Sequence, residues 1–289
     1  MTILAIGGTG TVGSEVVRGL VRRGRPVRVL SRSAAKASAL PPEVEGAVGD
    51  LGDPASLTGP FRDIDAVFLV TALDPEETRN GLAAVTAARA AKVSRLVYMS
   101  VHNLEQAQHI PHFASKIPIE RAIRESGIPY ALVQPNNFYQ VDYWFAEVIT
   151  RYGVYPQPIG GRGIDRVDVR DIADAVVNAL DQVGTASAVW PLVGPEALTG
   201  EAVAQVYSRL LDRPVRYGGD DLDAWATQAR AMMPEWMVHD LVIMYRHFQT
   251  EGLMATSEDR ARCREIVGHD PRQFEAFAAE LTSSAPRAS

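Results

Sequence analysis

A glycine-rich segment near the start of the chain constrains the fold more than any other feature of the sequence. It follows a short apolar run, residues 2–6, and opens an amphipathic stretch, Thr11–Arg22. The segment contains both Gly-x-x-Gly-x-x-Gly and Gly-x-Gly-x-x-Gly spacings and reads Gly7-Gly8-Thr9-Gly10-Thr11-Val12-Gly13. A strand, a glycine turn and a helix in this order form the pyrophosphate-binding unit of dinucleotide-binding domains. A turn without a ligand is the alternative, but glycines at these spacings are costly in conformational entropy.

The first half of the chain alternates strand-like and helix-like segments. The expected strands are the short apolar runs Thr2–Ile6, Val27–Leu30, Glu45–Val48, Ala66–Val70, Arg95–Met99 and Tyr130–Val133. The helices expected between them lie near Thr11–Arg22, Glu76–Ala91 and Pro118–Glu125. Continuously apolar runs are typical of strands covered on both faces. The alternation predicts an α/β fold with a doubly wound parallel sheet of the Rossmann type.

The pattern changes after Pro135, where strand-like runs become rare. Val169–Asp181 is predicted to be helical, and Leu222–Glu251 is read as part of a helical lobe rich in methionine and tryptophan. These Met and Trp side chains form either a core or the wall of an apolar pocket. We therefore expect a dinucleotide-binding domain over residues 1–150, joined by a returning segment 165–195. A smaller, mainly helical substrate lobe is expected over residues 196–289.

The end of the second expected strand indicates which dinucleotide binds. NAD-specific domains carry an acidic residue there, but this chain has no carboxylate in Leu30-Ser31-Arg32-Ser33, and Lys36 follows. Arg32 and Lys36 are expected to bind a 2′-phosphate, which favours NADP(H) over NAD(H). The alternative is that both are solvated surface charges. Ligands of such sheets lie beyond the carboxyl ends of the strands. The cofactor contacts expected on that ground are Asp50 and Leu51 near the adenine and Val70, Thr71 and Ala72 near the nicotinamide.

Several further blocks of sequence, together with the glycine motif, carry a family resemblance. They are Leu30-Ser31-Arg32, Val97-Tyr98-Met99-Ser100, His112-Phe113-Ala114-Ser115-Lys116, Gly127-Ile128-Pro129-Tyr130, Gln134-Pro135-Asn136-Asn137-Phe138-Tyr139 and Val167–Ala173. From residue 2 to about residue 195 the chain resembles the NmrA-like group of atypical short-chain dehydrogenases/reductases. The resemblance implies a Rossmann domain, a substrate lobe and NAD(P) binding. The group includes quinone, triphenylmethane-dye and ether reductases, and also regulators that bind the nucleotide without turnover.

The chain departs from the short-chain dehydrogenase pattern at one important position. Typical members carry Tyr-x-x-x-Lys with the tyrosine as proton donor, whereas here His112 stands at the tyrosine position, before Lys116. Helical spacing would put both side chains on one face. The resemblance implies that Lys116 binds the nicotinamide ribose. His112 is expected to donate the proton, because the unperturbed pKa of histidine is about 6.5. The alternative for His112 is a polar pocket wall without chemistry.

The resemblance implies further site residues at the ends of the fifth and sixth strands. Ser100 matches the region of the family's serine and either orients the substrate or only closes the strand end. In this family the loop after the sixth strand commonly lies against the nicotinamide and the substrate. Pro135, Asn136, Asn137 and Phe138 are expected there, the two asparagines as amide donors, although a plain turn would also explain the Pro-Asn-Asn sequence.

Composition excludes several other classes of function. The net charge of −6 disfavours binding to a nucleic-acid backbone, and no nucleic-acid partner is expected. No run reaches the about 18 apolar residues of a membrane span, so we expect a cytoplasmic monomer or homodimer without a membrane partner. The six histidines show no metal-ligand spacing, so no metal is expected. Cys263 stands among three arginines and is either a redox-sensitive thiol or an ordinary surface thiol.

Together these features predict an NADPH-dependent reductase. It would transfer hydride to an apolar, aromatic or quinone-like small molecule, with the catalytic residues Lys116, His112 and Ser100. The alternative is an NADP(H)-sensing regulator without turnover, which the missing tyrosine favours. A related lyase, isomerase or epimerase with a bound cofactor is a third possibility.

Overall fold

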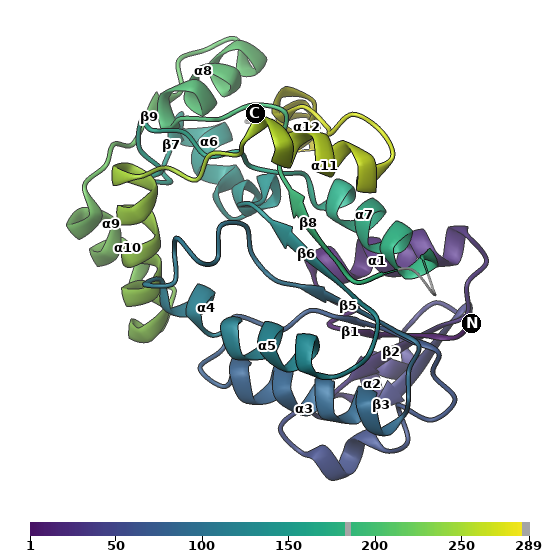
Figure 1. Cartoon of the computed structure of the whole chain (residues 1–289). Coiled ribbons are helices and arrows are strands. Elements are labelled where there is room, and N and C mark those ends of the chain that lie inside the picture. Colours follow the sequence, from purple (N-terminus) through teal and green to yellow (C-terminus); the bar gives the residue numbers. More distant parts are fainter. Residues whose placement is uncertain (183–185, 285–289) are drawn as a thin grey trace.

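Seven parallel strands form the central sheet of the protein (Figure 1). The computed structural model describes residues 1–182 and 186–284. The strands are β1 (Ile3–Ile6), β2 (Val27–Ser31), β3 (Val44–Val48), β4 (Ala66–Leu69), β5 (Arg95–Met99), β6 (Tyr130–Pro135) and β8 (Ala188–Leu192). Their order in the sheet is β3-β2-β1-β4-β5-β6-β8, which confirms the doubly wound α/β prediction. The order reverses between β1 and β4, and ligands of such sheets bind at the carboxyl ends of the strands beside this reversal.

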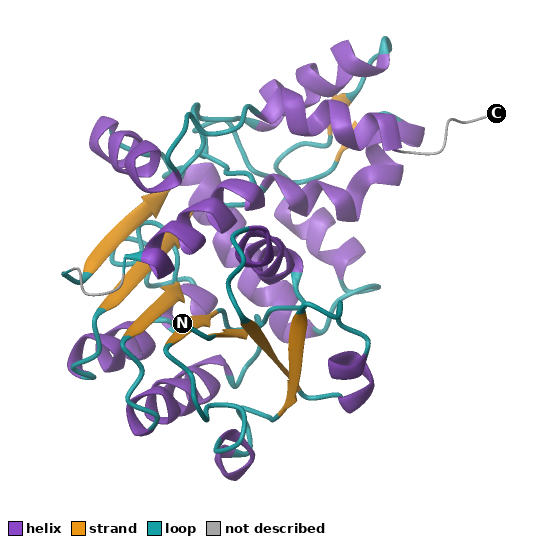
Figure 2. Ribbon diagram, turned by 90° about the vertical axis from the view of Figure 1, so that its right-hand side faces the viewer, coloured by secondary structure: helices purple, strands orange, loops and turns teal. Residues whose placement is uncertain are grey.

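Helices cover both faces of the sheet (Figure 2). The helices on one face are α1 (Thr11–Arg22), α7 (Val169–Asp181) and α11 (Ser257–Val267), and those on the other are α3 (Glu77–Ala90) and α5 (Ile117–Glu125). Successive strand residues alternate between the two cores, with Ile3 and Ala5 in the first and Leu4 and Ile6 in the second. Because both faces are buried, the strands are continuously apolar, as the sequence indicates.

The expected strands and helices of the first half are present, with ends shifted by at most two residues. The strand β8 was not expected, because Ala188–Leu192 contains Pro191, which has no N–H for a sheet ladder. Proline is tolerated here because β8 is the edge strand of the sheet. The short elements of this part are α2 (Ala34–Ser38), η1 (Pro54–Leu57) and α4 (Pro111–Ala114).

The C-terminal part is mainly helical. Its elements are η2 (Tyr139–Phe145), α6 (Ala146–Tyr152), β7 (Val154–Tyr155), α8 (Gly200–Leu211), β9 (Arg216–Tyr217), α9 (Leu222–Ala229), α10 (Glu235–Thr250) and α12 (Phe274–Ser284). The expected helical stretch Leu222–Glu251 is two helices, because Pro234 stands at the N-cap of α10. None of the described helices is long and apolar enough to cross a bilayer. The division of the chain into two lobes stays a prediction.

Helix α11 does not pack in the helical lobe but returns to the sheet, where it contacts α7 and β8. It places Cys263 in the core, and burial raises the pKa of the Cys263 thiol to about 11. The two interpretations of this cysteine from the sequence, a redox-sensitive thiol and a surface thiol, are therefore wrong. The charge of Arg264 acts to lower this pKa, but the desolvation of the buried thiol is the larger effect.

A buried ion pair joins η2, which follows β6, to the segment before α7. Arg166 and Asp142 have no exposed side-chain surface, and Nη2 of Arg166 lies 2.7 Å from Oδ1 of Asp142. Arg166 also donates to the backbone oxygen of Phe138 at 2.7 Å, and the Tyr207 hydroxyl donates to Oδ2 of Asp142 at 2.8 Å. These additional hydrogen bonds offset the cost of taking two charges out of water. The pair and its hydrogen bonds therefore hold the segment before α7, the backbone at Phe138, η2 and α8 together.

Removing Arg166 should destabilise the protein far more than removing an exposed arginine. In Arg166→Met, Asp142 stays buried without a cation, and we expect the free energy of unfolding to fall by about 3–5 kcal/mol in urea denaturation. The control is Arg209→Met on α8, whose exposed ion pair with Glu275 should contribute about 1 kcal/mol or less. Changing Asp142 to Leu as well should recover part of the loss. Equal losses for the two single variants would contradict this account.

Candidate active site

Two cavities adjoin at the carboxyl ends of the strands. The nucleotide cavity, about 680 Å³, lies over the ends of β1, β2, β3 and β4, and the apolar cavity, about 390 Å³, lies between the ends of β5 and β6 and helix α10. Both volumes are in the range of small-molecule sites. The residues common to the two cavity walls are Thr11, Thr71, Glu77, Met99 and Phe138. A ligand in one cavity therefore borders a ligand in the other.

The turn that floors the nucleotide cavity accepts only glycine at two positions. Gly7 has φ +78°, and a Cβ there would lie 2.8 Å from the backbone oxygen of Val70. A Cβ on Gly13 would lie only 2.1 Å from the backbone oxygen of Gly7. The absence of both side chains lets α1 pack against the end of β1 and keeps the backbone at the cavity surface.

No side chain of α1 or its N-cap compensates the partial positive charge at the N-terminus of this helix. Gly10 is the N-cap and supplies no side-chain hydrogen bond, and no acidic residue stands in the first turn. The amide groups of the first turn, Thr11 to Gly13, therefore keep their donors for an anion, which the helix dipole also attracts. This geometry fits the pyrophosphate of a dinucleotide.

The nucleotide cavity brings together most of the residues that the sequence indicates for cofactor binding. They are Gly7, Thr9, Gly10, Thr11, Val12, Gly13, Arg32, Lys36, Asp50, Leu51, Val70, Thr71, Ala72 and Phe138. Arg32 and Lys36 are exposed, and within residues 1–182 and 186–284 neither forms an ion pair with a carboxylate. Asp50 accepts the backbone N–H of Gly52 at 2.9 Å and so stabilises its own turn.

The apolar cavity is walled by aromatic and methionine side chains. The sequence left open whether the methionine and aromatic side chains of Leu222–Glu251 form a core or the wall of a pocket. The wall includes Trp144, Phe145, Trp225, Met233, Met237, Met244, Tyr245 and Phe248. Met232 and Trp236, also considered for this role, are instead 74% and 38% exposed. Six of the eight aromatic and methionine side chains in Leu222–Glu251 therefore line the cavity, and they come from α9, α10 and the turn between them.

Lys116 contacts a buried carboxylate that the sequence did not indicate as a site residue. Its Nζ pairs with Glu77, the first residue of α3, whose side chain is 1% exposed. The hydroxyls of Ser115 and Thr71 donate to the same carboxylate at 2.6 and 2.5 Å. Glu77 lines both cavities. In the sequence it is indistinguishable from an acidic residue that stabilises a helix start through the helix dipole.

His112 meets a second buried carboxylate that was also missed. Its Nδ1 lies 2.5 Å from Oδ1 of Asp240 on α10, and Asp240 is 4% exposed. His112 and Lys116 both line the apolar cavity, as expected, but they do not share one helix. Helix α4 ends at Ala114, because Pro118 near the start of α5 has no N–H to continue the ladder.

The other expected residues line the apolar cavity but differ in whether their polar groups are already hydrogen-bonded within the protein. Pro135, Asn136, Asn137 and Ser100 all line it. Ser100 is 2% exposed, and its Oγ has no hydrogen-bond partner in the described parts of the chain. Asn136 donates to the backbone oxygen of Leu253 at 2.8 Å, and its Nδ2 lies 3.2 Å from a buried histidine. Its amide donors are thus used within the protein, and this geometry does not support the expected donor role of Asn136 toward a nucleotide.

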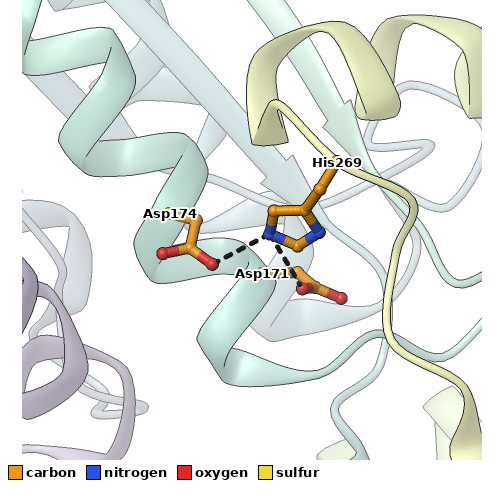
Figure 3. Close-up of side chains that lie close together, drawn as sticks. All are labelled: Asp171, Asp174 and His269. Atoms are coloured by element: carbon orange, nitrogen blue, oxygen red, sulfur yellow. Dashed lines mark hydrogen bonds and ion pairs between the residues drawn. The ribbon is translucent and has the colours of Figure 1, made fainter.

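A third group of polar side chains lies away from both cavities (Figure 3). Asp171 and Asp174 on α7 and His269 after α11 point toward one another, and three of their ligand atoms lie within 4.8 Å. The Arg272 guanidinium pairs with both carboxylates, at 3.1 Å for Asp174. The backbone oxygen of Asp270 and the Asp174 carboxylate raise the pKa of His269. We interpret the group as an ion-pair network that anchors this loop on α7, and the absence of a metal stays a prediction.

Substitution by alanine should have very different effects at Gly13, in the first turn of α1, and at Gly10, the N-cap of that helix. Gly13→Ala should lower the free energy of unfolding by about 1–3 kcal/mol or more, because the turn must shift to relieve the 2.1 Å approach. Gly10→Ala is the control, since its Cβ would meet its nearest neighbour at 3.4 Å and its φ is −83°. Thermal and urea unfolding measure both losses. A stable Gly13→Ala protein with unchanged nucleotide affinity would contradict the proposed turn.

Glu77 should stabilise the fold through Lys116. In Glu77→Gln the ammonium group stays largely buried without a counter-charge, and we expect a loss of about 3–5 kcal/mol in urea denaturation. Lys116→Met should also destabilise, because it leaves the carboxylate unpaired. The double variant should lose clearly less than the sum of the two single variants. Additive losses would show that the two side chains are not energetically coupled.

Comparison with known proteins agrees with this geometry. The profile of the NmrA-like family matches residues 1–278. An NAD(P)H azoreductase from Xenophilus azovorans is 33% identical over 278 residues, which cover 96% of each protein. A (4-alkanoyl-5-oxo-2,5-dihydrofuran-3-yl)methyl phosphate reductase from Streptomyces griseus subsp. griseus is 33% identical over 279 residues, which cover 96% of this chain and 97% of that protein.

The fold also matches a solved structure with a bound nucleotide. The NADPH-dependent quinone oxidoreductase of Escherichia coli, in complex with NADPH, superposes with a TM-score of 0.87 at 21% identity. The match covers 96% of this chain and 99% of that one. This chain belongs to the NmrA-like family and is an NAD(P)H-dependent oxidoreductase of the atypical short-chain dehydrogenase type.

Proposed function

We propose that the protein is an NADPH-dependent reductase that transfers hydride to an apolar, planar molecule of the aromatic or quinone type. The observation that carries this proposal is the junction of the two cavities at Thr71, Glu77, Met99 and Phe138. A dinucleotide with its pyrophosphate at the turn of α1 would extend along the strand ends toward this junction. The apolar cavity would then hold the acceptor, and water would be excluded from the reacting atoms.

The preference for NADPH rests on charge. Arg32 and Lys36 present two cations at the end of β2, where a carboxylate would be needed to bind the ribose hydroxyls of NADH. Neither cation has a carboxylate partner within the described residues, so both are available to a 2′-phosphate.

The substrate class follows from the apolar wall. Methionine adapts to irregular shapes, and tryptophan stacks on planar groups, so Met233, Met237 and Trp225 suit a flat aromatic ligand. The relatives' names support an electrophilic acceptor of this kind, since one is an azoreductase and the superposed structure is a quinone oxidoreductase.

Three polar side chains would act in this cavity. The cofactor would supply the hydride, and the protein would supply orientation and a proton. Lys116, held by Glu77, would bind the ribose beside the nicotinamide, and His112 would donate the proton. The unpartnered Ser100 hydroxyl would bind a polar atom of the acceptor.

Fluorescence titration with NADPH and NADH, followed by NADPH oxidation with azo dyes, quinones and triphenylmethane dyes, tests the proposal. We expect micromolar binding of NADPH and oxidation that depends on an acceptor. Tight binding without oxidation by any acceptor would instead favour the NADP(H)-sensing regulator. Binding of neither nucleotide would contradict both functions.

Reversing the charge of Arg32 should weaken the binding of NADPH much more than the binding of NADH. We expect Arg32→Glu to weaken NADPH binding by about 10- to 100-fold, the worth of a charge-assisted hydrogen bond, and to affect NADH far less. Arg62→Glu is the matched control, because it makes the same charge change in the loop before β4, outside both cavity walls. Unchanged NADPH affinity in Arg32→Glu would remove the argument for coenzyme preference.

A further inference from the structure

We propose that Asp240 is a positioning residue that orients His112 for proton donation, and that the site is complete only when α10 packs against α4. The proposal rests on the proposed reductase function and adds a residue and a structural role to it. The two side chains come from segments far apart in the sequence, and their contact at 2.5 Å links the sheet side of the cavity to the helical lobe.

The surroundings of Asp240 set it apart from a surface carboxylate. The face of α10 that lines the apolar cavity is formed by Met237, Leu241, Met244, Tyr245 and Phe248. Asp240 lies on this side of the helix, 4% exposed, as the one charged residue at helical spacing from Met237 and Met244. Within residues 1–182 and 186–284 the one polar contact of its carboxylate is His112, whose side chain is 15% exposed. A carboxylate buried in an apolar wall is costly unless a partner compensates it, and the imidazole is that partner.

The contact determines which nitrogen of His112 is available to the substrate. Nδ1–H donates to Oδ1 of Asp240, so Nε2 is the ring nitrogen left for a ligand in the apolar cavity. Within residues 1–182 and 186–284 no group bonds Nε2. A carboxylate that holds one ring nitrogen selects the tautomer and stabilises the imidazolium form, as in other acid–base sites that use histidine.

The proton then has a defined path. As hydride adds to a quinone or azo acceptor, the oxygen or nitrogen of the acceptor on which negative charge develops takes the Nε2 proton of the His112 imidazolium. The nucleotide is oxidised and the acceptor gains two electrons. His112 is left neutral with its proton on Nδ1, where Asp240 accepts it. The ring is ready for reprotonation from solvent, because the side chain is partly exposed.

Nuclear magnetic resonance of the nucleotide-free protein tests the orientation directly. Labelling the histidines with ¹⁵N distinguishes the two tautomers, and the His112 signal is assigned with His112→Gln. In the wild-type protein we expect Nδ1 to carry a proton across the titration. In Asp240→Asn we expect the neutral ring to shift toward the Nε2–H tautomer. An unchanged tautomer in Asp240→Asn would overturn the proposal.

Steady-state kinetics tests whether the orientation of His112 by Asp240 affects turnover. With an accepted quinone or azo dye, whose reduction takes up a proton with the hydride, Asp240→Asn should lower kcat by about tenfold or more, while the NADPH dissociation constant stays within about twofold. The double variant with His112→Gln should be no slower than His112→Gln alone, because Asp240 acts through the ring. Losses that multiply would overturn the proposal. The control is Glu235→Gln on α10, an exposed ion pair with Arg230, which should keep wild-type kcat.

The two proposals fail in distinguishable ways. A wild-type protein that binds NADPH but reduces no acceptor would overturn the reductase function and, with it, the catalytic role of Asp240. If Asp240→Asn unfolds, Asp240→Glu keeps the carboxylate. We expect it to retain the Nδ1–H tautomer and more activity than an Asp240→Leu variant, and an Asp240→Glu protein no more active than Asp240→Leu would count against the proposal.

Discussion

One guanidinium without exposed surface determines where the two cavities meet. Arg166 pairs with Asp142 of η2 and donates to the backbone oxygens of Phe138 and Tyr139, which follow β6. Phe138 lines both the nucleotide cavity and the apolar cavity. The position of the wall between the cofactor and the acceptor therefore depends on a buried charge pair that touches neither of them. Such a pair is costly to bury but even more costly to break, and it holds the loop in one arrangement.

The candidate active site also contains charged side chains that are paired with buried partners. The two basic side chains of the apolar cavity, Lys116 and His112, each meet a buried carboxylate, Glu77 on α3 and Asp240 on α10. One carboxylate comes from the sheet side and the other from the helical lobe. The basic groups are thus oriented before any ligand binds, which lowers the reorganisation needed during hydride and proton transfer.

The sequence predicted the nucleotide side of the site better than the substrate side. The glycine turn and the strand ends are local features, and the rule that ligands lie at the carboxyl ends of parallel strands brings them together without a structure. Glu77 and Asp240 were missed because their partners lie 39 and 128 residues away. A single aspartate in the apolar face of α10 was the available signal. Strand β8 was missed because Pro191 resembles a strand breaker. Asn136 lines the apolar cavity as expected, but its expected donor role is not supported, because its amide bonds a backbone oxygen far away in the sequence.

Direct hydride transfer between the adjoining cavities is the central claim, and isotopic labelling tests it most directly. The protein is given a triphenylmethane dye and NADPH deuterated at the transferred position of C4, and the leuco product is analysed by mass spectrometry. If the two cavities hold cofactor and acceptor side by side, one deuterium appears on the central carbon of the dye, where it does not exchange with solvent. Reduction without deuterium in the product, or binding of the dye without reduction, would contradict direct hydride transfer between the two cavities.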